Sequence, residues 1–330
     1  MYGFAISKQG QQHKTVGLPC QDYSEIIRIE TAEGGKLLAA CVADGVGSAK
    51  RSEHGAAAAG AAFLNTVRKG VQEAECDVEN LLRQAFCDAL QAVFDLAAAE
   101  NHSQNEYETT LTGCLLFDDG TLYYGHAGDG GLIGLFEDGT YKPLTRRCKG
   151  DTPNSTYPLS ARQHWSFGRA GANVAGAFLC SDGILDHFCS CDEMNGGMVY
   201  FPFIAPAFGP LCSENEVALL KKAWEDLLEG KQPYGGKTLP QLIGDDLSVV
   251  VLGRNEVMED TLKNVCWDEE KFNRDLLAAR RNLFPDLYPE PDTAPEVPPA
   301  SHGAGGDRGK KLRMKKAKGK AKKLRVIPET

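Results

Sequence analysis

The sequence feature that most constrains the fold is a set of apolar segments that each meet an aspartate at one end. A continuous apolar run of about four to eight residues between turn signals is typical of a buried strand. A carboxylate at the end of such a strand is costly unless it is paired or bound to a cation. Four positions share this arrangement: Asp44 after 36–43, Asp129 after 122–126, Asp182 after 174–180, and Asp245 before 247–252. The pattern therefore predicts a polar site where the ends of strands meet.

The other segments indicate a mixed fold of antiparallel strands and grouped helices. Helices are predicted over 52–71, 78–99 and 214–228, and further strands over 2–7 and 24–29. Between 110 and 144, short strands separated by Asp-Gly turns predict an antiparallel meander. Residues 145–172 are polar and predict an irregular surface flap. This order of elements predicts an α+β fold in which helices cover the sheets.

The chain divides into three predicted parts. Residues 1–255 carry the strands and the aspartates, and residues 256–288 form a helical extension with a helix from Asp268 to Leu283. Residues 289–330 begin with a Pro-rich linker and are expected to be disordered, because they combine few large apolar residues with high charge. From Arg308 to Arg325 this tail carries eleven Lys or Arg residues and no acid. Such a tail favours binding to an acidic partner or, nonspecifically, to nucleic acid.

Several classes of protein are disfavoured by the sequence. The eleven cysteines are scattered without a CxxC pair, which argues against a disulfide framework and a structural zinc site. A Cys-x₅-Arg loop, as a cysteine-dependent phosphatase requires, does not occur, and the Gly-rich stretches lack the context of a nucleotide-binding loop. No apolar run is long enough to span a bilayer, and no signal peptide is evident, so a cytoplasmic location is expected.

The aspartates at strand ends predict a site for hard cations. Asp-Gly is also a common turn dipeptide, and the acids of 118–120 and 137–139 are interpreted as turn residues because each group lies between two hairpin strands. That interpretation is less adequate for Asp44 and Asp182, which follow buried strands. Carboxylate oxygens suit Mg²⁺ or Mn²⁺ rather than zinc. Two such ions about 4 Å apart can generate a hydroxide nucleophile and hold a phosphoryl group in line.

With these motifs in order, the chain resembles the PP2C-type, metal-dependent serine/threonine protein phosphatases, in particular their bacterial members. The resemblance covers residues 1–255 and rests on Gln21-Asp22, Asp44-Gly45-Val46-Gly47-Ser48, Ser52-Glu53-His54-Gly55-Ala56, Gly128-Asp129, Ser181-Asp182-Gly183 and Asp245-Asp246-Leu247-Ser248. It implies a four-layer αββα sandwich with a binuclear metal centre at one edge of two central sheets.

The resemblance also implies roles for individual residues. Asp44 would bridge both metals, with the Gly45 carbonyl as a second ligand. Asp182 and Asp245 would complete the shell of the first metal, Asp22 would contribute through water, and Asp129 would hold a weaker third metal with Asp182. The expected cofactors are Mn²⁺ or Mg²⁺. The expected reaction is hydrolysis of phosphoserine or phosphothreonine by a metal-bridging hydroxide, in signalling that opposes a protein kinase, with a phosphorylated kinase or kinase target as the substrate.

Three positions depart from the pattern of the family. Gln21 stands where many members have a Glu ligand, Val46 where some have a histidine that acts as general acid, and Gly17 near the position of a phosphate-binding arginine. These departures leave an alternative open, a catalytically weak pseudophosphatase that acts as a phosphoprotein-binding regulatory module. A further alternative makes the basic tail primary, in a nucleic-acid-associated factor. His13 is expected at the surface, with contact to phosphate as the second interpretation.

Overall fold

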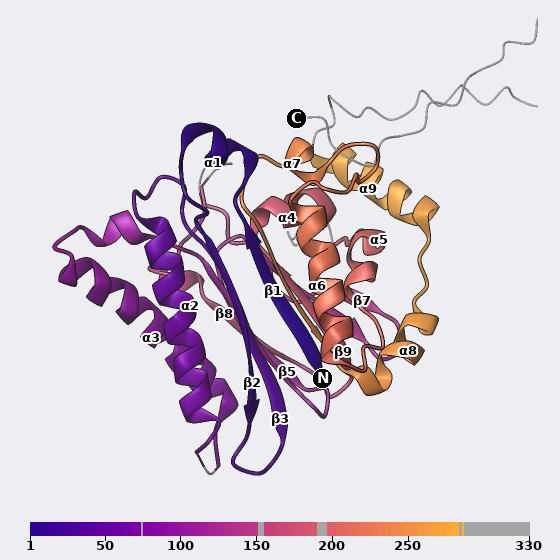
Figure 1. Ribbon diagram of the computed structural model, residues 1–330, viewed down its shortest axis with the longest axis horizontal. Helices are drawn as coiled ribbons and strands as arrows, with labels where there is room; N and C mark the ends of the chain where they lie inside the picture. Colours follow the sequence, from indigo (N-terminus) through magenta and orange to yellow (C-terminus); the bar gives the residue numbers. More distant parts are fainter. Residues whose placement is uncertain (74, 151–154, 190–196, 284–285, 287–330) are drawn as a thin grey trace, which may run out of the picture. The chain divides into compact units, whose positions relative to one another are not determined.

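The computed structural model describes residues 1–73, 75–150, 155–189, 197–283 and 286. The chain separates into one compact unit, Met1–Asp268, and a second unit that begins at Glu269. The boundary predicted at residue 255 lies inside the first unit. Every strand of the described residues belongs to the first unit, and Figure 1 follows its elements along the chain.

The first unit contains two antiparallel sheets. One sheet, here the α2-side sheet, has the order β2-β3-β4-β5-β8. Its strands are β2 (Asp22–Glu30), β3 (Lys36–Asp44), β4 (Leu111–Phe117), β5 (Leu122–Ala127) and β8 (Ser166–Ala170). The other, the α6-side sheet, has the order β1-β10-β9-β6-β7. Its strands are β1 (Tyr2–Lys8), β10 (Leu247–Gly253), β9 (Val174–Cys180), β6 (Gly131–Phe136) and β7 (Tyr141–Pro143).

Three apolar clusters hold the layers together. Leu38, Val42, Leu132, Leu179 and Val250 belong to the cluster between the sheets, to which both sheets contribute alternate strand positions. A second cluster joins the α2-side sheet to α2 (Ser52–Gly70) and α3 (Val78–Ala99). A third cluster joins the α6-side sheet to five helices. These are α4 (Asp182–Phe188), α5 (Phe201–Ile204), α6 (Glu214–Leu228), α7 (Leu239–Leu242) and α8 (Asn255–Asn264).

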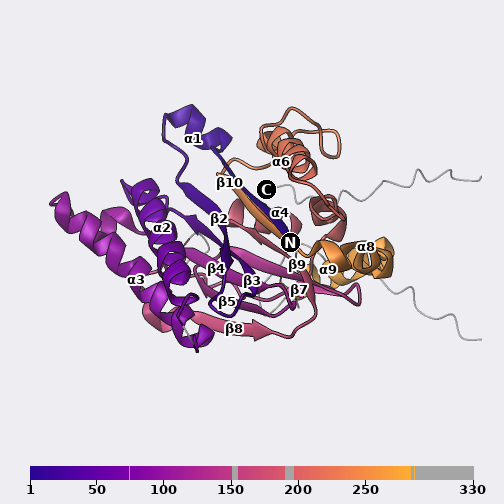
Figure 2. The same ribbon diagram turned by 60° about the horizontal axis from the view of Figure 1, so that its bottom comes forward.

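These layers form the expected αββα sandwich. Figures 1 and 2 show α2 and α3 on one side of the paired sheets and α4, α5 and α6 on the other. The short helix α1 (Gln11–Val16) buries none of its residues and lies outside the layers, between β1 and β2. Three 3₁₀ turns complete the unit: η1 (Gln104–Tyr107), η2 (Arg162–His164) and η3 (Ala205–Ala207).

Local signals explain where the long helices begin. The Asp77 side chain accepts hydrogen bonds from the backbone N–H groups of Glu79 and Asn80 at the start of α3. Ser213 and Glu216 form a reciprocal capping box at the start of α6. Because these signals are local, the observed bounds Val78–Ala99 and Glu214–Leu228 are those predicted from the sequence.

Two expectations for the region 110–172 were wrong. The four strands between 110 and 144 are not one meander: β4 pairs with β5 in one sheet, and β6 pairs with β7 in the other. The chain crosses between the sheets at Asp129-Gly130, so this turn is not a hairpin turn. The region 145–172 is not wholly irregular either, because β8 pairs with β5 as an edge strand. Its pairing partner lies about 40 residues earlier in the sequence, so local pattern did not reveal it.

The second unit is described only over the helix α9 (Glu269–Leu283) and residue 286. Acidic residues occupy its first turn and basic residues its last, which complements the helix dipole. The proposed linker and basic tail, residues 289–330, lie outside the described residues. In the described part of the chain, no helix has both the length and the apolar character needed to cross a membrane. The described cysteines that are free thiols include Cys20, Cys41, Cys76, Cys87, Cys114, Cys148, Cys212 and Cys266.

Candidate metal centre

The hairpin of β2 and β3 brings the first two predicted acids together. Asp22 and Asp44 are direct partners in the antiparallel register. Just beyond them, the Gly45 N–H donates to the Gln21 carbonyl over 3.1 Å. The Thr110 N–H donates to the Asp44 carbonyl over 2.8 Å, and the Asp44 N–H donates to Thr110 Oγ1 over 3.0 Å. The backbone of Asp44 is therefore fixed between β2 and the segment that leads into β4.

The other three predicted acids lie at the corresponding end of the α6-side sheet. Asp182 opens α4 directly after β9, and Asp245 lies just before β10. The Ser181 N–H donates to the Ser248 carbonyl over 3.1 Å, which ties the two strand ends together. The backbone of Gly183 packs so closely on this turn that an added Cβ would lie 2.5 Å from the Asp246 carbonyl oxygen. Asp129 precedes β6, whose first residue pairs with the end of β9.

The other four acids all act electrostatically on Asp44. Burial, and then the carboxylates of Asp22, Asp182, Asp245 and Asp129, raise the pKa of Asp44 well above its usual range. Burial and Asp246 raise the pKa of Asp22 to about 8. Burial and Asp129 are the largest causes that raise the pKa of Asp182 to about 6. Like charges held this close disfavour one another, so this cluster requires protons or bound cations.

The chemistry of the donors fits divalent cations. Asp22 Oδ2 and Gln21 Oε1 are both buried and have no hydrogen-bond partner among the described residues. Unpartnered buried oxygens beside clustered carboxylates are the donors that hard cations prefer. In the described part of the chain, no three His, Cys, Asp or Glu side chains converge closely enough to enclose an ion as they stand. The assignment of individual ligands therefore stays a proposal.

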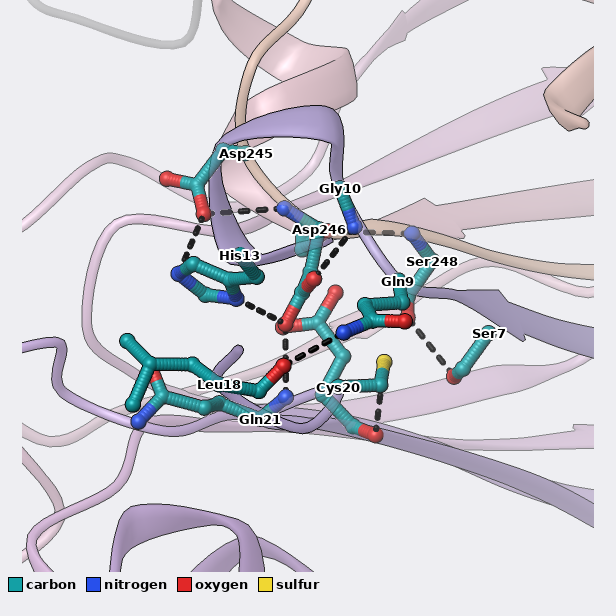
Figure 3. A network of polar contacts seen from close by, with 12 residues as sticks. Ser7, Gln9, Gly10, His13, Leu18, Cys20, Gln21, Asp245, Asp246 and Ser248 are labelled. Carbon is teal, nitrogen blue, oxygen red and sulfur yellow. Dashed lines mark hydrogen bonds and ion pairs between the residues drawn. The ribbon is translucent and has the colours of Figure 1, made fainter. Parts of the chain in front are cut away.

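Asp245 and Asp246 are neighbours with opposite environments. The Asp246 side chain is buried, whereas that of Asp245 is 56% exposed. Asp246 Oδ1 accepts from the Gly10 N–H over 2.6 Å, and its Oδ2 accepts from the Gln21 N–H over 2.6 Å (Figure 3). Asp246 thus fastens the start of β10 to the ends of the loop that carries α1. This geometry suits Asp246 to a supporting role and leaves Asp245 free to face a ligand.

His13 is not the surface residue that was expected. Its side chain is only 15% exposed, with Nδ1 2.9 Å from Asp246 Oδ2 and Nε2 3.8 Å from Asp245 Oδ1 (Figure 3). The reason is that α1 folds back on the β10 turn, where the Gln12 N–H donates to the Gly244 carbonyl over 2.8 Å. Contacts between segments more than 200 residues apart carry no local sequence signal, so sequence reasoning missed this position.

A second residue that sequence reasoning missed is Arg147. Its side chain is 9% exposed and forms an ion pair with Asp186 of α4. The Cys148 N–H donates to the Gly128 carbonyl over 2.8 Å, which places this segment against the turn that carries Asp129. A pair of arginines in a polar segment, Arg146 and Arg147, gave no signal in the sequence that one of them is buried. The structure adds a buried positive charge beside the acids.

Comparisons with known proteins agree with the geometry. The family described as protein phosphatase 2C matches residues 9–229. Serine/threonine-protein phosphatase 3 of Escherichia coli K12 is 26% identical over 269 residues, which cover 80% of this chain and 97% of that protein. The serine/threonine phosphatase Stp1 of Staphylococcus aureus has a similar fold, with a TM-score of 0.50 and 13% identity over 77% of this chain and 94% of its own.

The same fold extends to a more distant protein. A sex determining protein of C. elegans aligns with a TM-score of 0.50 and 14% identity, over 81% of this chain and 68% of its own. At such identities the structures establish the αββα fold, and the family match establishes membership. The chain belongs to the protein phosphatase 2C family of serine/threonine phosphatases.

Proposed function

We propose that this protein hydrolyses phosphoserine and phosphothreonine in proteins with two divalent cations, Mn²⁺ or Mg²⁺. The observation that carries the proposal is the convergence of Asp22, Asp129, Asp182 and Asp245 on the buried carboxyl group of Asp44. When bound, the two cations would neutralise the phosphoryl oxygens and activate a bridging water as hydroxide, which is the chemistry that hydrolysis of a phosphate ester requires.

The chain's own residues supply the ligands and their support. Asp44 would bridge the two cations, and the Gly45 carbonyl would approach one of them closely. An added Cβ on Gly45 would lie 2.6 Å from Ser52 Cβ, so only glycine fits this packing. Asp182 and Asp245 would complete the shell of the first cation, and Asp22 would contribute through water. Gln21 Oε1 offers a neutral oxygen, which would hold the second cation more weakly than a carboxylate.

The loop after Asp44 contains no histidine that could act as a general acid. Val46 occupies the position two residues after Asp44 and has no titratable group. We therefore assign protonation of the departing Ser or Thr oxygen to solvent at the metal centre. Asp246 would act indirectly. Its carboxylate accepts hydrogen bonds from the backbone N–H groups of Gly10 and Gln21 and so fixes the start of β2 at Asp22.

The physiological setting is proposed from the family alone. A phosphorylated kinase or kinase target would be the substrate, and the enzyme would oppose that kinase in cytoplasmic signalling. The basic tail would add an electrostatic contact to an acidic partner or, nonspecifically, to nucleic acid.

The decisive experiment measures phosphate release from a phosphothreonine peptide with Mn²⁺, Mg²⁺ or EDTA. Wild-type protein should release phosphate only with metal, and Asp44→Ala should lose at least about a thousandfold in rate, since it removes the bridging ligand. Asp138→Ala is the matched control, because Asp138 is an acid of a hairpin turn between β6 and β7.

The phosphatase activity of the control variant Asp138→Ala should stay within about twofold of wild type. Failure of the wild type to release phosphate from several peptides with any metal would instead support the pseudophosphatase.

A further inference from the structure

Arg147 is a buried positive charge at the edge of the acidic cluster. It lies in the segment that follows β7, and its side chain is nine-tenths buried. The backbone bond from Cys148 to Gly128 holds this segment against the crossover turn, one residue from Asp129. The pairing of Gly131 with Cys180 in turn places that crossover beside the start of α4. The arginine therefore enters the cluster from the side where Asp129 and Asp182 lie.

One carboxylate contacts the guanidinium, and two others act on it through their charge. Nη1 pairs with Oδ1 of Asp186, which lies one helical turn after Asp182 in α4. Burial lowers the pKa of Arg147, but the charges of Asp186, Asp129 and Asp182 outweigh it and raise that pKa. Burial raises the pKa of Asp129, and the Thr156 hydroxyl and the Arg147 charge offset only part of that rise. The ion pair and these mutual effects place one fixed positive charge among Asp129, Asp182 and Asp186.

The remaining donors of Arg147 face the interior. Nε and Nη2 are both buried, and neither has a hydrogen-bond partner among the described residues. A guanidinium that solvent does not reach keeps its full charge and exerts a strong field on its neighbours. A further divalent cation between Asp129 and Asp182 would lie against this charge.

We propose that Arg147 takes the place of the third cation that the family resemblance assigns to Asp129 and Asp182. The guanidinium neutralises this side of the cluster permanently, so the protein binds two divalent ions and excludes a third. The inference rests on the proposed function, because it presupposes that the other acids bind metal. It also gives Asp129 a different role from the predicted one: Asp129 pairs with Arg147 electrostatically and is not a metal ligand.

The test is the stoichiometry of Mn²⁺ binding, which is measured by calorimetry and by the electron paramagnetic resonance signal of free Mn²⁺. Wild-type protein should bind two ions and no third at millimolar Mn²⁺. Arg147→Gln should gain a third ion, with affinity on the order of tenfold to a hundredfold above any residual third binding in wild type, because one adjacent positive charge is removed. Arg147→Lys keeps the charge and should bind two.

Two further variants locate the effect. Arg146→Gln removes one positive charge from the adjacent, exposed position and should leave the count at two. Arg147→Gln combined with Asp129→Asn should lose the gained ion, because the third site then lacks a carboxylate. Thermal unfolding of each variant shows whether it is folded, and the wild-type count alone tests the proposal if Arg147→Gln does not fold.

The outcomes are separable. Three ions in wild type would overturn the proposal. So would an unchanged count in folded Arg147→Gln together with weaker inhibition by inorganic phosphate, which would identify Arg147 as a phosphate-binding residue. Wild-type protein that binds no Mn²⁺ at all would refute the proposed function itself.

Discussion

At the scale of single residues, the candidate site holds more negative charge than the fold alone would tolerate. Asp44 is buried among four other carboxyl groups, and the buried Arg147 lies on the Asp129 side of this cluster. Uncompensated charge of this kind destabilises a folded protein and persists where function needs it. Catalysis and stability should therefore respond to Asp44 in opposite directions.

Asp44→Asn should raise the stability of the metal-free protein while it abolishes phosphatase activity. Removing one of several mutually repelling buried charges should stabilise the protein by about 1–3 kcal/mol. Urea denaturation in EDTA measures the effect, with Asp138→Asn as a turn-acid control that should show no gain. A less stable Asp44→Asn protein would mean that the site is already neutralised without metal.

His126 provides a pH-dependent contribution to stability. It is fully buried in β5, with Nδ1 2.9 Å from Thr112 Oγ1. Burial is the largest cause that lowers the pKa of His126 to about 4, from an ordinary value of 6.5. The unfolded chain therefore binds a proton between these values that the folded chain does not bind. Stability from this residue is complete above pH 6.5 and is lost as the pH falls toward 4.

Replacing this histidine should flatten the acid side of the stability curve. Relative to wild type, His126→Gln should lose less stability between pH 7 and pH 4, by about 3 kcal/mol at the acid end. Urea denaturation in EDTA at four pH values gives the two curves. The aspartates of the site titrate in both proteins, so the difference between the curves isolates His126. Parallel curves would contradict the prediction.

At the scale of elements, close backbone packing positions the site. The β2–β3 register sets Asp22 opposite Asp44, and α2 starts just after the loop that follows Asp44. The first turns of α2 pack directly on η1: a Cβ added to Gly55 would lie 1.9 Å from the Tyr107 carbonyl oxygen. Glycine at this position permits the close approach of two backbone segments.

Gly55→Ala should therefore destabilise the protein, although alanine is usually favoured over glycine inside a helix. The added methyl group would have to displace backbone, at a cost of about 1–3 kcal/mol. Gly47→Ala is the control, since an added Cβ there meets no atom within 4 Å. Thermal unfolding of both variants decides the matter, and a stabilised Gly55→Ala would show that α2 and η1 are not packed as described.

At the scale of the whole molecule, the compact unit extends beyond the predicted domain boundary. The helix α8 follows residue 255 and buries Met258 and Thr261 completely, with Met258 in the cluster under the α6-side sheet. A chain that ends at residue 255 would expose that part of the core. We therefore propose that the folding unit ends near Asp268.

Two truncated chains test this boundary. A chain that ends at Asp268 should keep the thermal stability and the metal-dependent activity of the full chain. A chain that ends at Arg254 should lose about 2–5 kcal/mol, because removing Met258 and its neighbours leaves a cavity and an exposed apolar surface. Equal stability of the two chains would restore the boundary at residue 255.

The sequence by itself determined the elements and the identity of the acids. The helix Val78–Ala99 and the strand Val174–Cys180 have the bounds that periodicity and turn residues predicted. Asp44 and Asp182 stood out because a carboxylate at the end of a buried strand needs a partner. Such properties depend on a residue and its near neighbours in the chain, so they can be predicted without the tertiary structure.

Only the tertiary structure decided which strands share a sheet and what surrounds each acid. The crossover at Asp129, the edge strand β8, the contact of His13 with Asp246 and the burial of Arg147 all depend on contacts between segments distant in sequence. Strand pairing and ion pairing are selected by the burial of the whole core, and a local pattern is compatible with several such arrangements. The acids could therefore be named from the sequence, whereas the positive charge among them could not.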